Sequence, residues 1–106
     1  MKLAKFEDSG WENLSSFNIQ GRIKNGWAAI LVQNLTVTGT QSTEVTIMTL
    51  PDKYWPSTTI WGQAHTNTLS DVDVRWLTVD TAGRLKTVIQ SANGKENIVG
   101  IVCYPV

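Results

Sequence analysis

The residues best suited to bind a ligand lie between Thr59 and Asn67. Successive side chains of an extended strand alternate between two faces, and one face of this segment is polar and aromatic. That face carries Trp61, Gln63, His65 and Asn67. Tryptophan offers a flat apolar surface to the C–H face of a sugar ring, while amide and imidazole groups exchange hydrogen bonds with its hydroxyls. This face therefore has the composition of a saccharide-binding site.

Catalysis and metal binding have little support in the residue types. The chain has one histidine, His65, and one cysteine, Cys103, so one chain cannot build a histidine-rich or multi-cysteine metal site. Ser70 and Asp71 follow His65, but no Gly-x-Ser-x-Gly nucleophile elbow occurs. Asp71 and Asp73 are two residues apart on one strand face, where carboxylates are more often solvated than paired for glycoside hydrolysis. We expect no enzymatic activity, no cofactor and no metal site.

Composition favours one domain with a neutral ligand. The 106 residues, 42% hydrophobic and 17% charged, have the size and composition of a single globular domain. Nine basic and nine acidic residues give a net charge of zero, which provides no electrostatic basis for binding nucleic acid. The longest apolar stretch, Trp27 to Val32, is too short to span a bilayer. The N-terminal region has acidic residues where a signal peptide needs an apolar run.

Short apolar segments separated by Gly, Asn, Asp and Pro predict an all-β domain. Asn25-Gly26 and Asn93-Gly94 are suited to hairpin turns, and the segment between Pro51 and Pro56 is predicted to be a loop that crosses between strands. We therefore predict an antiparallel β-barrel or sandwich with Greek-key connections and about seven strands. The candidate strands are Phe17–Ile23, Trp27–Thr38, Thr43–Leu50, Thr58–Thr66, Val72–Asp80, Arg84–Gln90 and Asn97–Tyr104.

Alternation assigns faces to several of these strands. Val45 and Ile47 are predicted to lie on a buried face, opposite Glu44 and Thr46. Val72, Val74 and Trp76 are predicted to form a buried face opposite exposed Asp73 and Arg75. The run from Trp27 to Val32 is apolar on both faces, which indicates a central strand or one packed against another subunit.

Five tryptophans in so small a chain cannot all be ligand platforms. Trp27 and Trp76 lie in apolar phases of their strands and are predicted to pack in the core or at a subunit interface. Trp11 is predicted to pack near the start of the domain, while Trp55 and Trp61 are open to either interpretation. Cys103 falls in an apolar run and is predicted to be a buried thiol, because free cysteine behaves as a small hydrophobic residue.

Five motifs, taken in order over nearly the whole chain, resemble the C-terminal head domain of phage tail-tip receptor-binding proteins, particularly those of phages that infect lactococci. The motifs are GWENL at 10–14, WAAILV at 27–32, IMTLPDKYWP at 47–56, VDTAGRL at 79–85 and IVGIVCY at 98–104. The resemblance implies an antiparallel β-barrel that assembles as a homotrimer on a fibrous stem and binds saccharides of the host cell wall. Residues 1–15 would lead into the head from such a stem. Two departures are the missing stem and the presence of Lys53 and Trp55 where related fibres commonly have glycine and arginine.

The resemblance also implies site residues. Sugar and glycerol sites in that family combine a tryptophan, a histidine, an acidic or amide residue, and an arginine. By position, these roles fall to His65 and Asn67 on one strand, then to Asp71 or Asp73 and to Arg75 or Trp76, with Arg84 as a further candidate. The predicted saccharide-binding residues are His65, Asn67, Trp61, Gln63, Asp73, Arg75 and Trp76.

Each of these residues also has a purely structural interpretation. His65 would then be a strand histidine without a ligand, and Asn67 a turn residue. Asp73 and Arg75 would be an exposed ion pair that contributes at most about 1 kcal/mol.

The resulting hypothesis is a host-recognition module in the virion, at the tail tip or baseplate, that acts outside the host cell. Its expected partners are host cell-wall saccharides, two further copies of the chain, and other phage baseplate proteins, without nucleic acid or membrane insertion. The alternative is a structural fibre or decoration module that trimerises and binds no carbohydrate. A third reading, a cell-wall hydrolase fragment, would require two carboxylates that face each other across a cleft. Exposure of Trp61, His65 and Asn67 together would favour the first hypothesis over the second.

Overall fold

A computed structural model describes residues 8–15, 18–66 and 73–106. The predicted all-β, antiparallel fold is confirmed, and each predicted strand is present to within about two residues at either end. The described residues form eight strands rather than about seven, together with one short 3-10 helix. The elements are β1 (Glu12–Ser15), β2 (Ile19–Lys24), β3 (Trp27–Thr38), β4 (Thr43–Thr49), η1 (Asp52–Tyr54), β5 (Ile60–Thr66), β6 (Val74–Val79), β7 (Arg84–Ile89) and β8 (Lys95–Pro105). The part of the chain that the structure describes contains no helix long and apolar enough to cross a membrane.

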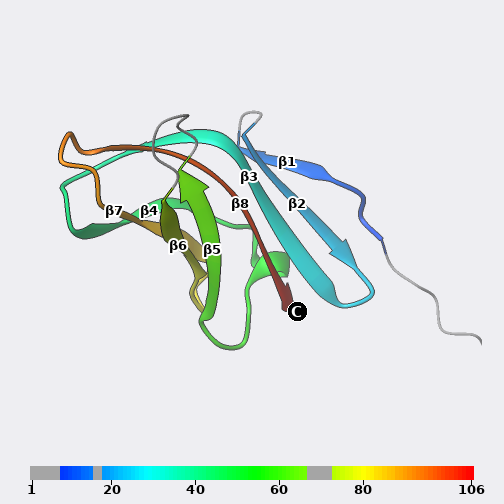
Figure 1. Ribbon diagram of the computed structural model, residues 1–106. Coiled ribbons are helices and arrows are strands. Elements are labelled where there is room, and N and C mark those ends of the chain that lie inside the picture. The colour runs from blue at the N-terminus through cyan, green and yellow to red at the C-terminus, as the bar shows by residue number, and fades with distance from the viewer. Residues whose placement is uncertain (1–7, 16–17, 67–72) are drawn as a thin grey trace, which may run out of the picture.

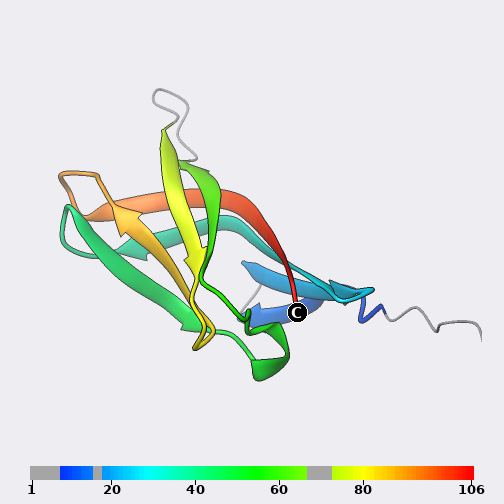
Figure 2. The same cartoon turned by 90° about the horizontal axis from the view of Figure 1, so that it is seen from below.

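All eight strands belong to one sheet, in the order β1-β2-β3-β8-β5-β6-β7-β4. Every neighbouring pair in this order is antiparallel. The sheet curls into a half-barrel, with β1 at one edge and β4 at the other (Figures 1 and 2). Because β8 lies between β3 and β5, the centre of the sheet depends on pairings between distant parts of the chain.

The two asparagine–glycine turns follow from backbone conformation. Asn25 and Gly26 both have positive φ, at 53° and 79°, as a two-residue hairpin turn between β2 and β3 requires. Gly94, with φ of 73°, occupies the turn before β8. The long pairing of β3 with β8 is interrupted by a bulge between Val32 and Leu35, where Asn34 has φ of 46°. Bulges of this kind increase the local twist, which helps the sheet to curl.

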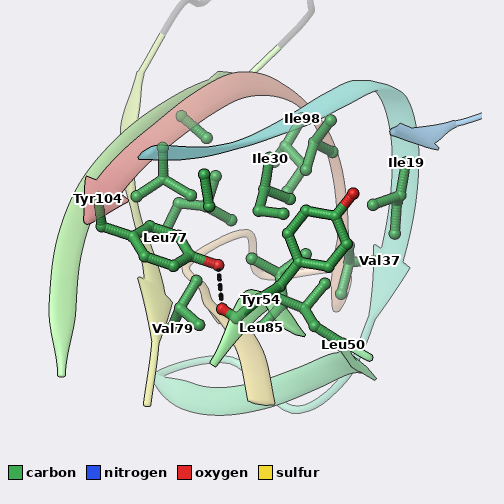
Figure 3. Packing of buried hydrophobic residues seen from close by; sticks show 14 of the residues in the cluster. Ile19, Ile30, Val37, Leu50, Tyr54, Leu77, Val79, Leu85, Ile98 and Tyr104 are labelled. Atoms are coloured by element: carbon green, nitrogen blue, oxygen red, sulfur yellow. Dashed lines mark hydrogen bonds between the residues drawn. The ribbon is translucent and has the colours of Figure 1, made fainter. Parts of the chain in front are cut away.

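Two tyrosines anchor the core inside the half-barrel (Figure 3). Tyr54 and Tyr104 are 0% and 1% exposed, and the Tyr104 hydroxyl donates a hydrogen bond to the Tyr54 carbonyl oxygen at 2.6 Å. Burial raises the pKa of both phenols, that of Tyr54 to about 12. The other buried hydrophobic residues are Ile19, Ala28, Ile30, Val32, Val37, Leu50, Ala64, Leu77, Val79, Leu85, Ile89, Ile98 and Val102.

The loop between Pro51 and Pro56 links the two edges of the sheet at one end of the half-barrel. It follows β4, and its Tyr54 hydroxyl donates a hydrogen bond to a carboxylate oxygen of Glu12 on β1 at 2.9 Å. The Lys53 amino group pairs with the same carboxylate, 2.7 Å from Oε2, which also accepts from Tyr54, and 3.0 Å from Oε1. Hydrogen bonds from Lys53 and Tyr54 lower the pKa of Glu12. The predicted crossing loop therefore closes the fold and contacts β1 through Glu12, in addition to the pairing of β1 with β2.

We expect the substitution Tyr104→Phe to destabilise the domain by about 1–2 kcal/mol, because it leaves the buried Tyr54 carbonyl without its donor. Urea denaturation followed by tryptophan fluorescence would measure the change. The matched substitution Tyr54→Phe removes a hydroxyl whose partner, Glu12, is partly exposed, and it should cost less. A larger loss in the free energy of unfolding for Tyr54→Phe than for Tyr104→Phe would contradict this interpretation.

Two predictions of buried side chains, those for Cys103 and Trp27, are wrong for the single chain. Cys103 is exposed because its neighbours Val102 and Tyr104, at 3% and 1% exposure, point into the core. Trp27 is 56% exposed because the adjacent Ala28 points inward. Trp11 is 45% exposed. The alternative for Trp27, contact with another subunit, stays a prediction.

The faces of β6 are inverted relative to the prediction over its first three residues. Val74 and Trp76 are 54% and 53% exposed, whereas the Arg75 side chain is only 10% exposed. Arg75 can be covered because its guanidinium pairs with buried Glu96. By contrast, β4 has the predicted faces, with Val45 and Ile47 half-buried.

Candidate functional site

The outer face of β5 presents the predicted ligand-binding side chains. Trp61, Gln63 and His65 are exposed, while Ala64 between them is fully buried against the core. The period-two assignment of this strand is therefore confirmed for these residues. Asn67 lies outside the described residues.

Neighbouring strands place two further side chains beside Gln63. It pairs with Trp76 on β6 and with Ile101 on β8, and both are about half exposed. Along β5, Trp61 and His65 lie two residues before and after Gln63, each at a distance of roughly 7 Å from it along the strand. Gln63 is thus the polar centre of a surface whose other members are aromatic, aliphatic or imidazole. Its amide makes no hydrogen bond within the described part of the chain.

Trp61 and Trp76 contact each other on this surface. Their ring centroids are 5.7 Å apart and the ring planes meet at 86°, an edge-to-face arrangement. Trp61 pairs across the strands with Thr78, so the two tryptophans are diagonal neighbours, within reach of long side chains. With 65% and 53% of their surfaces exposed, they keep each other oriented and still offer indole surface to a ligand.

Among the residues that the structure describes, the lysine or arginine nearest to this surface is paired with carboxylates. Lys86 on β7 lies opposite Thr78 on β6, which in turn lies opposite Trp61 on β5. Its amino group is 3.2 Å from a carboxylate oxygen of Asp80 and 3.4 Å from one of Glu44. Partial burial alone would raise the pKa of Asp80, but hydrogen bonds from Arg84 and Lys86 outweigh it and lower that pKa to about 2.

Arg75 and Asp73, also predicted as ligand residues, are not brought together with the tryptophans. Arg75 pairs across the strands with Ala64, whose side chain points into the core. Its Nε is 3.2 Å from Glu96 Oε1, and another guanidinium nitrogen is 3.9 Å from Asp73. Asp73 itself is exposed. Within the described residues, Arg75 therefore has a structural role beneath β6 rather than a place on the outer face.

The sequence provides no signal for one member of the surface. Ile101 joins it only because β8 pairs with β5, and nothing in the local sequence indicates that pairing. Among the described residues, no group of three or more His, Cys, Asp or Glu side chains is placed to hold a metal ion.

The fold is that of a phage receptor-binding head domain, the class that the sequence motifs resemble. In particular, it is similar to the crystal structure of the head domain of phage bIL170, described among the receptor-binding domains of lactococcal phages. The TM-score is 0.68 at 17% sequence identity, over 92% of this chain and 97% of that one. No protein-family model and no curated protein matches the sequence. The resemblance is thus confirmed at the level of the fold.

Proposed function

We propose that this chain is a phage receptor-binding head domain that binds saccharides of the host cell wall through the outer face of β5 and β6, without catalysis. One observation carries the proposal: two exposed tryptophans, Trp61 and Trp76, lie beside the amide of Gln63, which has no hydrogen-bond partner among the described residues. Indole surface next to hydrogen-bonding groups suits a sugar, which has an apolar face and a rim of hydroxyls. The similarity of the fold to a lactococcal phage receptor-binding domain supports the same role.

The proposal includes assembly as a homotrimer at the tail tip, in contact with other baseplate proteins. The outer face of β3 supports a protein contact, because it exposes Trp27 and includes half-buried Leu31 and Ala29. Apolar surface of this extent commonly marks an interaction site. Three weak sugar sites in each trimer, and many trimers in each virion, would raise the overall avidity through effective concentration.

We expect Trp61→Ala and Trp76→Ala each to weaken binding to host cell walls about tenfold or more, which corresponds to about 1.4 kcal/mol of lost contact. His65→Ala should also weaken binding, because the imidazole lies at the far end of the same face. Binding of the fluorescently labelled domain to cell walls from lactococci and related bacteria would measure the effect. Sedimentation of each variant would confirm that its oligomeric state is unchanged.

Trp11→Ala is the matched control, because Trp11 is also about half exposed but precedes β1 and lies outside the proposed site. It should bind as wild type does. A wild-type domain that forms trimers but binds no cell wall or glycan would favour the structural fibre module instead.

A further inference from the structure

Most lysines and arginines in the described part of the chain are paired with carboxylates. Apart from Lys2 and Lys5, every lysine and arginine lies in the described residues. Five of these described cations form ion pairs: Arg22 with Asp8, Lys53 with Glu12, Arg75 with Glu96, Arg84 with Asp80, and Lys86 with Asp80 and Glu44. The remaining two, Lys24 and Lys95, lie at the far ends of β2 and β8. By strand geometry each is roughly 20 Å from Gln63, too far for a shared ligand contact.

The ionic cluster nearest the tryptophan pair among the described residues is already balanced, because Lys86 and Arg84 neutralise Asp80 and Glu44. Lys86, with 19% of its side chain exposed, lies between the carboxylates of Asp80 and Glu44. A phosphate that approached Lys86 would also approach the carboxylates of Asp80 and Glu44, which already bind its ammonium group. It could recruit Lys86 only by displacing an existing partner, and like charges brought together in this way oppose binding.

The polar group at the centre of the surface favours hydroxyls over phosphate. The Gln63 amide offers both N–H donors and a carbonyl acceptor. A sugar hydroxyl donates and accepts, and so can use both ends of the amide. An ionised phosphate oxygen only accepts, and it would leave the amide carbonyl without a partner. The described residues beside Gln63 are Trp61, Trp76, Ile101 and His65, of which only His65 has an ionisable side chain.

The length of the surface exceeds one sugar ring. From Trp61 to His65 is four residues of extended strand, roughly 13 Å. The two indole planes, 86° apart, present separate faces at one end of this strip, and His65 is at the other. From the charge and length of this surface we infer that the site takes an uncharged saccharide segment of at least two units and discriminates against phosphorylated sugars. This inference rests on the proposed function and deepens it.

The test uses the indole N–H signals of the five tryptophans in NMR spectra of the whole chain at neutral pH. Lactose, cellobiose and chitobiose are the neutral probes, and galactose with galactose 6-phosphate is the matched pair for charge. Neutral disaccharides should shift the Trp61 and Trp76 signals and bind severalfold more tightly than galactose. Galactose 6-phosphate should bind no more tightly than galactose, and added salt should leave these affinities unchanged. Trp11, Trp27 and Trp55 provide internal control signals that stay in place.

Lys86→Gln separates the two kinds of site, because it removes the nearest cation and leaves both tryptophans intact. It should leave disaccharide affinity unchanged. Tighter binding of galactose 6-phosphate than of galactose, abolished by Lys86→Gln or by salt, would overturn the inference while leaving a saccharide-binding function in place. If host cell-wall polysaccharide shifts the Trp61 and Trp76 signals only while it carries its phosphate groups, the inference is also overturned. The saccharide-binding function would again stand. If neither the probes nor any cell-wall polysaccharide shifts these signals, both the inference and the proposed function are wrong.

Discussion

Replacing Gly83 with alanine is expected to destabilise the domain by about 3 kcal/mol, whereas Gly26→Ala should cost about 1 kcal/mol. Both glycines have positive φ, 77° and 79°, which disfavours any side chain by a similar amount. The difference lies in the surroundings. A Cβ at Gly26 would meet no atom within 4 Å, whereas a Cβ at Gly83 would overlap the indole ring of Trp55.

Trp55 has little freedom to move away from that overlap. Its indole N–H donates a hydrogen bond to the Leu50 carbonyl oxygen at 2.7 Å, and the Leu50 N–H donates to the Gly83 carbonyl oxygen at 2.8 Å. Leu50 and Tyr54, on the same loop, are buried in the core. Displacement of the indole therefore disturbs the loop that closes the half-barrel, and overpacking of this kind typically costs 1–3 kcal/mol beyond the backbone strain.

Urea denaturation of the two glycine variants would measure how much each substitution lowers the free energy of unfolding. A double-mutant cycle sharpens the comparison, because Trp55→Ala removes the atoms that the new Cβ would overlap. In the Trp55→Ala background, Gly83→Ala should cost about as much as Gly26→Ala does in the wild type. Equal costs at the two glycines in the wild-type background would show that the contact between Gly83 and Trp55 is unimportant.

Sequence patterns predicted local structure where short-range chemistry decides it. The Asn25-Gly26 turn follows from the tolerance of these two residues for positive φ. The shared face of Trp61, Gln63 and His65 follows from strand geometry alone. The strand β1 was missed because four residues carry too little alternation, and it pairs with β2 and contacts Lys53 on the loop that follows β4.

Alternation shows which side chains share a face, but it does not show which face is covered. On β6 the apolar residues Val74 and Trp76 were assigned to the core, yet Arg75 is the covered one. Its partner Glu96 is on another strand and 21 residues away, and no local pattern reveals the pair. The candidate site changes for the same reason: Trp76 joins Trp61 and Gln63 on the outer face, and Arg75 leaves them.

Glu96→Ala is expected to destabilise the domain by about 3–5 kcal/mol, because it leaves a covered guanidinium without its main partner. The Glu96 side chain is 1% exposed, and its Oε1 accepts hydrogen bonds from Arg75 Nε and from the backbone N–H groups of Gln90 and Ser91. One carboxylate thus joins β6 to the turn between β7 and β8. Glu96→Gln keeps an oxygen acceptor and loses only the charge, so we expect a smaller cost of about 2 kcal/mol.

The pH dependence of stability provides a second readout for this pair. Burial alone would raise the pKa of Glu96, but the backbone N–H groups of Gln90 and Ser91, together with Arg75, outweigh burial and lower it below its ordinary value of 4.5. The unfolded chain therefore takes up a proton at higher pH than the folded chain does. The stability contributed by this carboxylate is complete above its unfolded-state pKa and is lost as the pH falls through its folded-state pKa.

Urea denaturation at a series of pH values would measure both effects. Glu96→Gln should flatten the acid limb of the stability profile, because the variant has no carboxylate to protonate at this position. Glu44→Gln is the matched control, since Glu44 also pairs with a cation, Lys86, but its side chain is 49% exposed. It should change stability by less than about 1 kcal/mol. If the two glutamine variants have the same stability and the same acid limb, the buried pair does not anchor β6, and the strand that carries Trp76 is held by its backbone pairing alone.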